Sequence, residues 1–160
     1  MRWLKLVPLM ACLLMACPMP SVAWAQPPME VQAAQFTRAY LGAWSSDGHA
    51  SLGQVRRIYA PQVRFYGRVL THSALEAEKR RFLERWPSRV FALRPGTVRV
   101  SCDGRVCSVH AVLDWRAESV ARRAVTRGAS RFVQTFDFSA ARPVVVAETG
   151  SVLRRARRNT

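Results

Sequence analysis

The feature that most constrains the fold is the stretch from Thr97 to Trp115, in which apolar and polar residues alternate. A period of two places successive side chains on opposite faces of a β-strand, so each half has one apolar face and one mixed face. Asp103-Gly104 interrupts the alternation with residues typical of a tight turn. The stretch therefore predicts a β-hairpin with one core-facing side, which the rest of the chain must cover.

Two cysteines, Cys102 and Cys107, lie on the two halves of this hairpin. In an oxidising compartment they predict a disulfide, because two thiols without nearby histidines make a poor metal site, the alternative. Closing so short a loop is worth roughly 2 kcal/mol. A two-residue turn at Asp103-Gly104 would pair Cys102 with Arg105, so we expect the disulfide to require a four-residue loop instead.

The N-terminus has the layout of a secretory signal peptide. Arg2 and Lys5 precede a short apolar run at residues 6–15, and an Ala-x-Ala pattern ends at Ala25. Cleavage there would remove residues 1–25 and leave 135 of the 160 residues in the periplasm or outside the cell. The alternative is a lipoprotein signal, because Leu-Met-Ala before Cys17 resembles a lipobox and would leave the chain anchored at that cysteine.

The charge of the chain is strongly basic, with 25 Lys and Arg against 10 Asp and Glu. Such a balance favours contact with an anionic membrane or envelope surface, and a merely solvated basic surface is the alternative. The export signal argues against nucleic acid as the partner. We expect residues 154–160 to form a disordered basic tail that makes this contact through Arg154, Arg155, Arg157 and Arg158.

The remaining periodicity predicts an α+β domain over residues 26–153. Ser73 and Glu76 form a capping box at the start of one helix, and Arg127-Gly128 predicts the turn between two long strands. We expect two to three N-terminal helices packed on a curved, mostly antiparallel sheet. The expected helices are 29–44, 52–59 and 73–86, and the expected strands beside the hairpin are 62–68, 89–94, 131–139 and 143–153.

This order of elements resembles the superfamily of cone-shaped domains related to nuclear transport factor two, which includes SnoaL-like cyclases and ketosteroid isomerases. The stretches Y-A-P-Q-V-R-F-Y-G at 59–67 and K-R-R-F-L-E-R-W-P at 79–87 are similar to parts of secreted bacterial members. The resemblance covers Met29 to Leu153. It implies a pocket between helices and sheet, but it implies no reaction, because the superfamily mixes enzymes with binding and assembly modules.

One residue of the predicted third helix departs from the pattern. Lys79 falls inside the apolar stripe of Leu75, Phe82 and Trp86, and it is the only lysine left after removal of the signal. It either extends along Phe82 to water or points into the pocket. In the second case Tyr66 is the preferred partner, with Glu148 and Asp137 as alternatives. The candidate pocket residues are Lys79, Tyr66, Trp86, Tyr40 and Tyr59.

No nucleotide loop, metal-spaced histidines or nucleophile elbow occurs in the sequence, and no cofactor or metal is predicted. We expect His49, His72 and His110 at the surface, and Asp114 and Asp137 facing solvent. The sequence favours a binding or accessory module whose pocket holds a small, anionic ligand. The alternatives are a small lyase, isomerase or hydrolase using the same pocket, and an assembly domain that forms a homodimer through its open sheet face. Converging titratable groups in the pocket would favour an enzyme.

Overall fold

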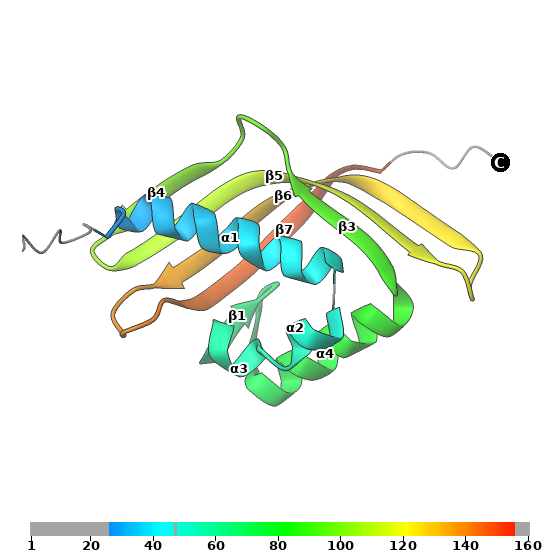
Figure 1. Ribbon diagram of the computed structural model, residues 1–160, viewed down its shortest axis with the longest axis horizontal. Helices are drawn as coiled ribbons and strands as arrows, with labels where there is room; N and C mark the ends of the chain where they lie inside the picture. The colour runs from blue at the N-terminus through cyan, green and yellow to red at the C-terminus, as the bar shows by residue number, and fades with distance from the viewer. Residues whose placement is uncertain (1–25, 47, 156–160) are drawn as a thin grey trace, which may run out of the picture.

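A computed structural model describes residues 26–46 and 48–155. The predicted signal peptide, Cys17 and the last five residues lie outside the described residues. Four helices and seven strands follow one another along the chain (Figure 1). They are α1 (Met29–Ser46), α2 (Gly48–Leu52), α3 (Val55–Ile58), β1 (Tyr59–Phe65), β2 (Arg68–Thr71), α4 (His72–Arg85), β3 (Ser88–Leu93), β4 (Arg99–Asp103), β5 (Val106–Ser119), β6 (Ala124–Asp137) and β7 (Val144–Arg155).

The seven strands form a single curved sheet in the order β2-β1-β7-β6-β5-β3, and β4 pairs with another part of β5. Every pairing is antiparallel except that of β1 with β7, which is parallel. The helices lie on one side of this sheet, with α1 crossing its strands (Figure 1). The predicted α+β class, with helices on a curved and mostly antiparallel sheet, is confirmed. No helix among the described residues is long and apolar enough to cross a membrane.

The hairpin of β4 and β5 confirms the predicted disulfide and corrects its loop. Cys102 pairs with Cys107 across the two strands, and their sulfurs are bonded. Asp103 pairs with Val106, so the turn consists of two residues that begin at Gly104, whose φ of 55° suits a glycine. The expected four-residue loop was therefore wrong, because moving the turn by one residue satisfies both the tight turn and the disulfide.

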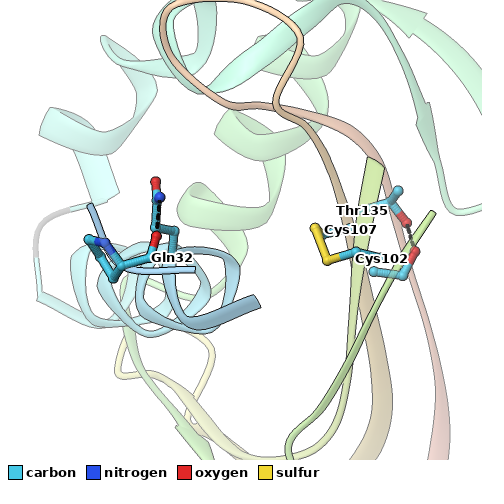
Figure 2. The surroundings of a disulfide bond; sticks show 6 residues. Gln32, Cys102, Cys107 and Thr135 are labelled. Carbon is cyan, nitrogen blue, oxygen red and sulfur yellow. Dashed lines mark hydrogen bonds between the residues drawn. A yellow bond between two sulfur atoms is a disulfide. The ribbon is translucent and has the colours of Figure 1, made fainter. Parts of the chain in front are cut away.

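The disulfide lies on the covered side of the sheet. Figure 2 shows the sulfur bridge pointing toward α1, whereas the hydroxyl of Thr135 lies on the other side, bonded to that of Ser108. Cys107 is fully buried and belongs to the core with Val109 and Leu113 from the same strand. The alternation that predicted the hairpin therefore identified its core-facing side correctly.

The turn between β5 and β6 was misplaced in the prediction. Ser119 pairs with Ala124, so the loop is formed by residues 120–123 and the predicted turn at Arg127-Gly128 lies inside β6. A glycine in a basic stretch is a weak turn signal, and here Gly128 pairs with Trp115 across the sheet. The strands are consequently 14 residues each.

The second expected helix is interrupted, and its last residue belongs to the sheet. Instead of one helix over 52–59, α2 and α3 are separate short helices, and Tyr59 is the first residue of β1. β1 and β2 are joined by Tyr66 and Gly67, which both have positive φ, at 47° and 84°. Two such residues make the turn that joins a tight hairpin, which ends the expected strand 62–68 early.

The N-cap of helix α4 lies two residues before the predicted one. Thr71 is the N-cap, with its hydroxyl accepting from the amide of Ala74, and Ser73 lies within the helix. The capping box of Ser73 and Glu76 was therefore wrong, although the end of the helix before Trp86 is confirmed. At the other terminus β7 continues to Arg155, two residues beyond the expected domain boundary, and it pairs there with β6.

The core forms where the helices meet the concave sheet. On α1, residues at helical spacing are buried, and Phe36 is exposed while its neighbour Thr37 is fully buried. On α4 the buried residues are Leu75, Lys79 and Leu83, at intervals of four. Tyr59 and Val63 of β1 complete this side of the core. A lysine thus occupies the middle of the face with which α4 packs on the domain.

Candidate functional site

Six polar side chains from five elements meet between the helices and the sheet. Because each points from its element toward the covered side of the sheet, they form one connected network that we call the polar cluster. Its members are Thr37 and Tyr40 of α1, Tyr59 of β1, Lys79 of α4, Gln134 of β6 and Glu148 of β7.

The carboxylate of Glu148 is the centre of the polar cluster. Its Oε2 accepts a hydrogen bond from Tyr40 at 2.8 Å and one from Tyr59 at 2.6 Å, and Gln134 Nε2 lies 3.5 Å away. Its Oε1 accepts no hydrogen bond from the described residues and lies 3.7 Å from the ammonium of Lys79. One carboxylate oxygen is therefore fixed by two phenols, and the other faces a cation.

Lys79 provides the positive charge of the cluster. Its Nζ donates to the phenol oxygen of Tyr40 at 2.8 Å. Tyr40 donates its single proton to Glu148, so its oxygen can accept from the ammonium at the same time. The hydroxyl of Tyr59 lies 2.6 Å from Glu148 Oε2 and 2.8 Å from the Tyr40 oxygen, so its single proton is shared between these two acceptors. With the side chains of Lys79 and Glu148 only 9% and 6% exposed, this ion pair is an interior one. The prediction that Lys79 points inward is confirmed, and extension to water is excluded.

Four aromatic rings surround the ammonium. Its Nζ lies 4.6 Å from the ring centroid of Trp44, 4.8 Å from Phe65, 5.2 Å from Tyr59 and 5.3 Å from Tyr40. Faces of aromatic rings attract cations at such distances, most strongly where water is excluded. The rings therefore replace part of the hydration that Lys79 loses on burial.

The indole N–H of Trp44 has no hydrogen-bond acceptor among the described residues. Its indole Nε1 is buried and makes no hydrogen bond with the described residues. A buried N–H without a partner is costly, and native structures contain few of them. Next to it, Lys79 has three N–H groups but makes one short hydrogen bond, to Tyr40. The indole N–H of Trp44 is therefore a buried donor that no group of the described chain satisfies, and the ammonium of Lys79 lies over the ring that carries it.

Burial sets the protonation of the cluster. It raises the pKa of Tyr40 and of Tyr59 well above the ordinary value, and the charge of Glu148 raises both further. Both phenols therefore remain protonated donors at neutral pH. Burial also lowers the pKa of Lys79, and the negative charge of Glu148 opposes that change in part.

Burial within the cluster is graded. Thr37 and Gln134 are completely buried, and Thr37 donates to Gln134 Oε1 at 3.0 Å. Exposure rises to 5% at Glu148, 8% at Lys79 and 9% at Tyr40. The Thr37–Gln134 end is therefore more deeply buried than Lys79 and Tyr40, although Tyr59 beside them is only 1% exposed.

The structure brings together three of the five predicted pocket residues. Lys79, Tyr40 and Tyr59 belong to the polar cluster. The prediction of Tyr66 as the preferred partner of Lys79 was wrong. Tyr66 lies in the β1–β2 turn, where it is half exposed and packs edge-on against the ring of Phe65. Trp86 follows α4 with the guanidinium of Arg85 over its ring, outside the cluster.

The two alternative partners differ in outcome. Asp137 binds the amide of Ser139 at the end of β6, away from Lys79. Glu148 is the residue that pairs with Lys79, as one alternative proposed. Three residues of the site were not predicted from the sequence, namely Thr37 and Gln134 of the polar cluster and Trp44 beside it. For Gln134 a signal was available, because this glutamine occupies a core-facing position of an alternating strand, and a buried amide needs hydrogen-bond partners nearby.

Outside the cluster, His72 and Asp114 have structural contacts, whereas His49 and His110 are exposed. His72 is half-buried rather than at the surface, and its Nε2 lies 2.9 Å from the carbonyl of Tyr59, which joins α4 to β1. Asp114 pairs with Arg94 on the exposed side of the sheet. No three His, Cys, Asp or Glu side chains of the described chain come together as a metal-binding group.

Comparison with known proteins gives the fold. No protein-family model matches the chain, and no curated protein matches it. Among solved structures it is similar to a nuclear transport factor 2 (NTF2-like) superfamily protein from Salmonella enterica, with a TM-score of 0.66 and 11% identity over 81% of this chain and 94% of that one. The chain has the NTF2-like fold.

Two further structures agree. A protein from Kribbella flavida has a TM-score of 0.66 and 11% identity over 81% of this chain and 96% of that one. An uncharacterised protein with a cystatin-like fold from Caulobacter vibrioides has a TM-score of 0.64 and 12% identity over 79% and 92%. At these identities the similarity concerns the NTF2-like backbone, so the chemistry of the site must be argued from its own residues.

Proposed function

We propose that this NTF2-like domain is a small-ligand-binding module, and that its ligand places an oxygen acceptor against Lys79 and Trp44. The observation that carries the proposal is the buried indole N–H of Trp44, which has no acceptor, beside an ammonium that makes one short hydrogen bond. A carbonyl or carboxylate oxygen would satisfy both donors. Such a ligand would agree with the small, anionic ligand predicted from the sequence.

The surroundings suit such a ligand. The aromatic rings of Trp44 and Phe65 offer apolar faces, and a buried cation attracts an anionic oxygen more strongly than an exposed one does. Glu148 opposes an anion, but two phenols already direct protons to one of its oxygens. Because Lys79 and Tyr40 keep the most exposure in the cluster, the ligand would enter from their side.

Native mass spectrometry of the protein purified from its own compartment tests this proposal. We expect a small molecule bound to the wild-type chain and lost from Trp44→Phe, which removes the indole donor and keeps an aromatic ring. Trp86→Phe is the matched control, because Trp86 lies outside the cluster. Equal retention of the molecule by both variants would refute a role for the Trp44 donor.

A second candidate function is acid–base catalysis by Glu148. The observation that favours it is the division of the carboxylate. One oxygen is held by Tyr40 and Tyr59, and the other, Oε1, faces Lys79 at 3.7 Å and accepts no hydrogen bond of 3.5 Å or less from the described residues. In this reaction Oε1 would take a proton from the carbon next to a carbonyl, and the bonding electrons would move to the carbonyl oxygen. Lys79 and Trp44 would stabilise the resulting oxyanion.

Deuterium incorporation separates the two candidates. The carbonyl compound recovered with the protein would be incubated in D₂O and followed by NMR. Catalysed exchange that is lost in Glu148→Gln, with the compound still bound, supports an enzyme. Binding without exchange leaves the domain a binding module.

Export remains part of the proposal. The bridged Cys102 and Cys107 support an oxidising compartment, in agreement with the signal-like N-terminus, and the basic chain would there meet anionic surfaces. Sequencing of the N-terminus of the exported protein would distinguish cleavage after Ala25 from a lipidated Cys17.

A further inference from the structure

A second depression lies on the outside of the domain, between the middle of α1 and the loop that joins β3 to β4. Its volume is about 410 Å³, within the range of small-molecule sites, and it is open to solvent. We call it the α1 groove. It is lined by Arg38, Leu93, Arg94, Pro95, Gly96 and Val98, none of which belongs to the polar cluster.

The loop side of the α1 groove is held in place by hydrogen bonds to β5. The amide of Arg94 donates to the carbonyl of Val112 at 2.8 Å, and the amide of Val112 donates to Thr97 Oγ1 at 3.1 Å. Gly96 has a φ of 73°, which glycine adopts without strain. The groove therefore has a preformed wall, which lowers the conformational entropy that a ligand must overcome.

The carbonyl groups of this wall already have donors. Thr97 donates to the carbonyl of Arg94 through its hydroxyl at 2.7 Å. Arg99 Nη1 donates to the carbonyls of Gly96 and Val98 at 3.0 and 2.9 Å. These oxygens are consequently less available to a ligand and repel an anion less.

The donors of the α1 groove, in contrast, are not all used. Arg38 is exposed and makes no ion pair with the described residues. The guanidinium of Arg94 is fixed by Asp114 through Nε and Nη2, at 3.0 and 2.5 Å, and this leaves its Nη1 uncommitted. Asp114 cancels one positive charge, so Arg38 and Arg99 leave the groove with an excess of positive charge.

We propose that the α1 groove binds a small carboxylate with an apolar body. The guanidinium of Arg38 would hold the carboxylate by two parallel hydrogen bonds, for which its planar geometry is suited. The apolar body would lie on Leu93, Pro95 and Val98, of which Leu93 and Val98 are partly buried against the core. This site is independent of the ligand proposed for the polar cluster.

Octanoate tests the proposal by titration calorimetry at low salt, with octylamine as the cationic molecule of equal chain length. We expect octanoate to bind and octylamine to give no heat of binding. Arg38→Gln should weaken octanoate binding at least fivefold, whereas Arg80→Gln, at an exposed site on α4, should change the Kd less than twofold. Equal binding of both molecules, or an unchanged Kd in Arg38→Gln, would overturn the proposal.

Amide NMR locates the bound molecule. In the α1 groove, octanoate should shift the signals of Gly96 and Val98 and leave those of Tyr59 and Glu148 unchanged. Shifts confined to Tyr59 and Glu148 would place octanoate at the polar cluster and refute the α1 groove, while leaving the proposed function of the cluster intact.

Discussion

Replacement of Lys79 by methionine is the most informative single change in this domain. Methionine keeps a flexible, unbranched side chain of similar length, so the ring faces around the ammonium remain in contact with it. What it removes is the positive charge 3.7 Å from Glu148 Oε1 and the hydrogen bond to Tyr40. The variant therefore tests the two polar contacts of Lys79 and keeps most of its apolar ones.

The expected cost follows from what is left behind. Removal of one partner from a buried ion pair destabilises by about 3–5 kcal/mol, because the other charge stays buried. Here Glu148 keeps the phenol hydrogen bonds of Tyr40 and Tyr59, which places the loss at the lower end. We expect Lys79→Met to lower the free energy of unfolding by about 3 kcal/mol.

Urea unfolding followed by circular dichroism measures this loss. Arg80→Met is the matched control, since Arg80 is the next residue of α4 and is exposed. It should change stability by less than about 0.5 kcal/mol. Adding Glu148→Gln to Lys79→Met removes the stranded charge, so the double variant should recover part of the loss, with a coupling of about 1–3 kcal/mol.

The pH dependence of the stability difference between the wild type and Lys79→Met is an independent test. Because burial lowers the pKa of Lys79 below its ordinary 10.5, the unfolded chain binds more protons than the folded chain between the two values. Stability from this group therefore rises with pH in that window, and the deficit of Lys79→Met should widen toward pH 10. An equally or more stable Lys79→Met variant would refute the reasoning, because it would mean that the ammonium has no effective partner inside the domain.

Three further predictions concern other parts of the structure. Tyr59→Phe should lower the free energy of unfolding by about 1.5–3 kcal/mol, because it removes a hydrogen bond to Glu148. Above pH 10 the unfolded chain releases the Tyr59 proton while the folded chain keeps it, so wild-type stability should fall more steeply with pH than that of the variant. Equal slopes of stability against alkaline pH would contradict this. Cys107→Ser should lower stability by roughly 2 kcal/mol, and thiol labelling of the denatured, unreduced wild type should find no reactive thiol in the mature chain. Gly42→Ala should stabilise by about 0.5–1 kcal/mol, because nothing lies near the added carbon in α1. Gly150→Ala should destabilise, because its Cβ would lie 2.6 Å from a carbonyl oxygen of the neighbouring strand. Changes in melting temperature of the same sign, measured by calorimetry, would disprove the distinction.

Alternation and helical periodicity were sufficient for the main elements, because burial of one face is a local property that the sequence displays directly. The hairpin and α1 follow from it, whereas the end of α4, expected at Trp86 and observed at Arg85, follows from Pro87. Turn positions failed where more than one signal competed. Arg127-Gly128 looked like a turn, but a strand that is long enough to pair continues through a glycine at small cost, and the observed turn at 120–123 contains no glycine.

The site was only partly predictable for a different reason. Lys79 could be found because a charge within an apolar stripe conflicts with local patterning. Its partner Glu148 could be named only as an alternative, because Glu148 lies on a strand whose register against β1 is set by sheet topology. Tyr66 was preferred because it is near in sequence, yet Lys79 bonds to Tyr40 and pairs with Glu148, and it is the backbone amide of Tyr66 that donates to the carbonyl of Glu148. Long-range pairing is the information that periodicity lacks.

The parallel pairing of β1 with β7 also determines the order in which the chain can fold. Tyr59 is aligned with Val145, and Phe65 with Glu148, so this edge of the sheet cannot close until the last strand is present. During synthesis from the N-terminus, apolar faces therefore remain uncovered on α1, α4 and the β1–β2 hairpin while the antiparallel strands are still being made. The buried lysine therefore gains its counter-ion, Glu148, only when the C-terminal strand has been made.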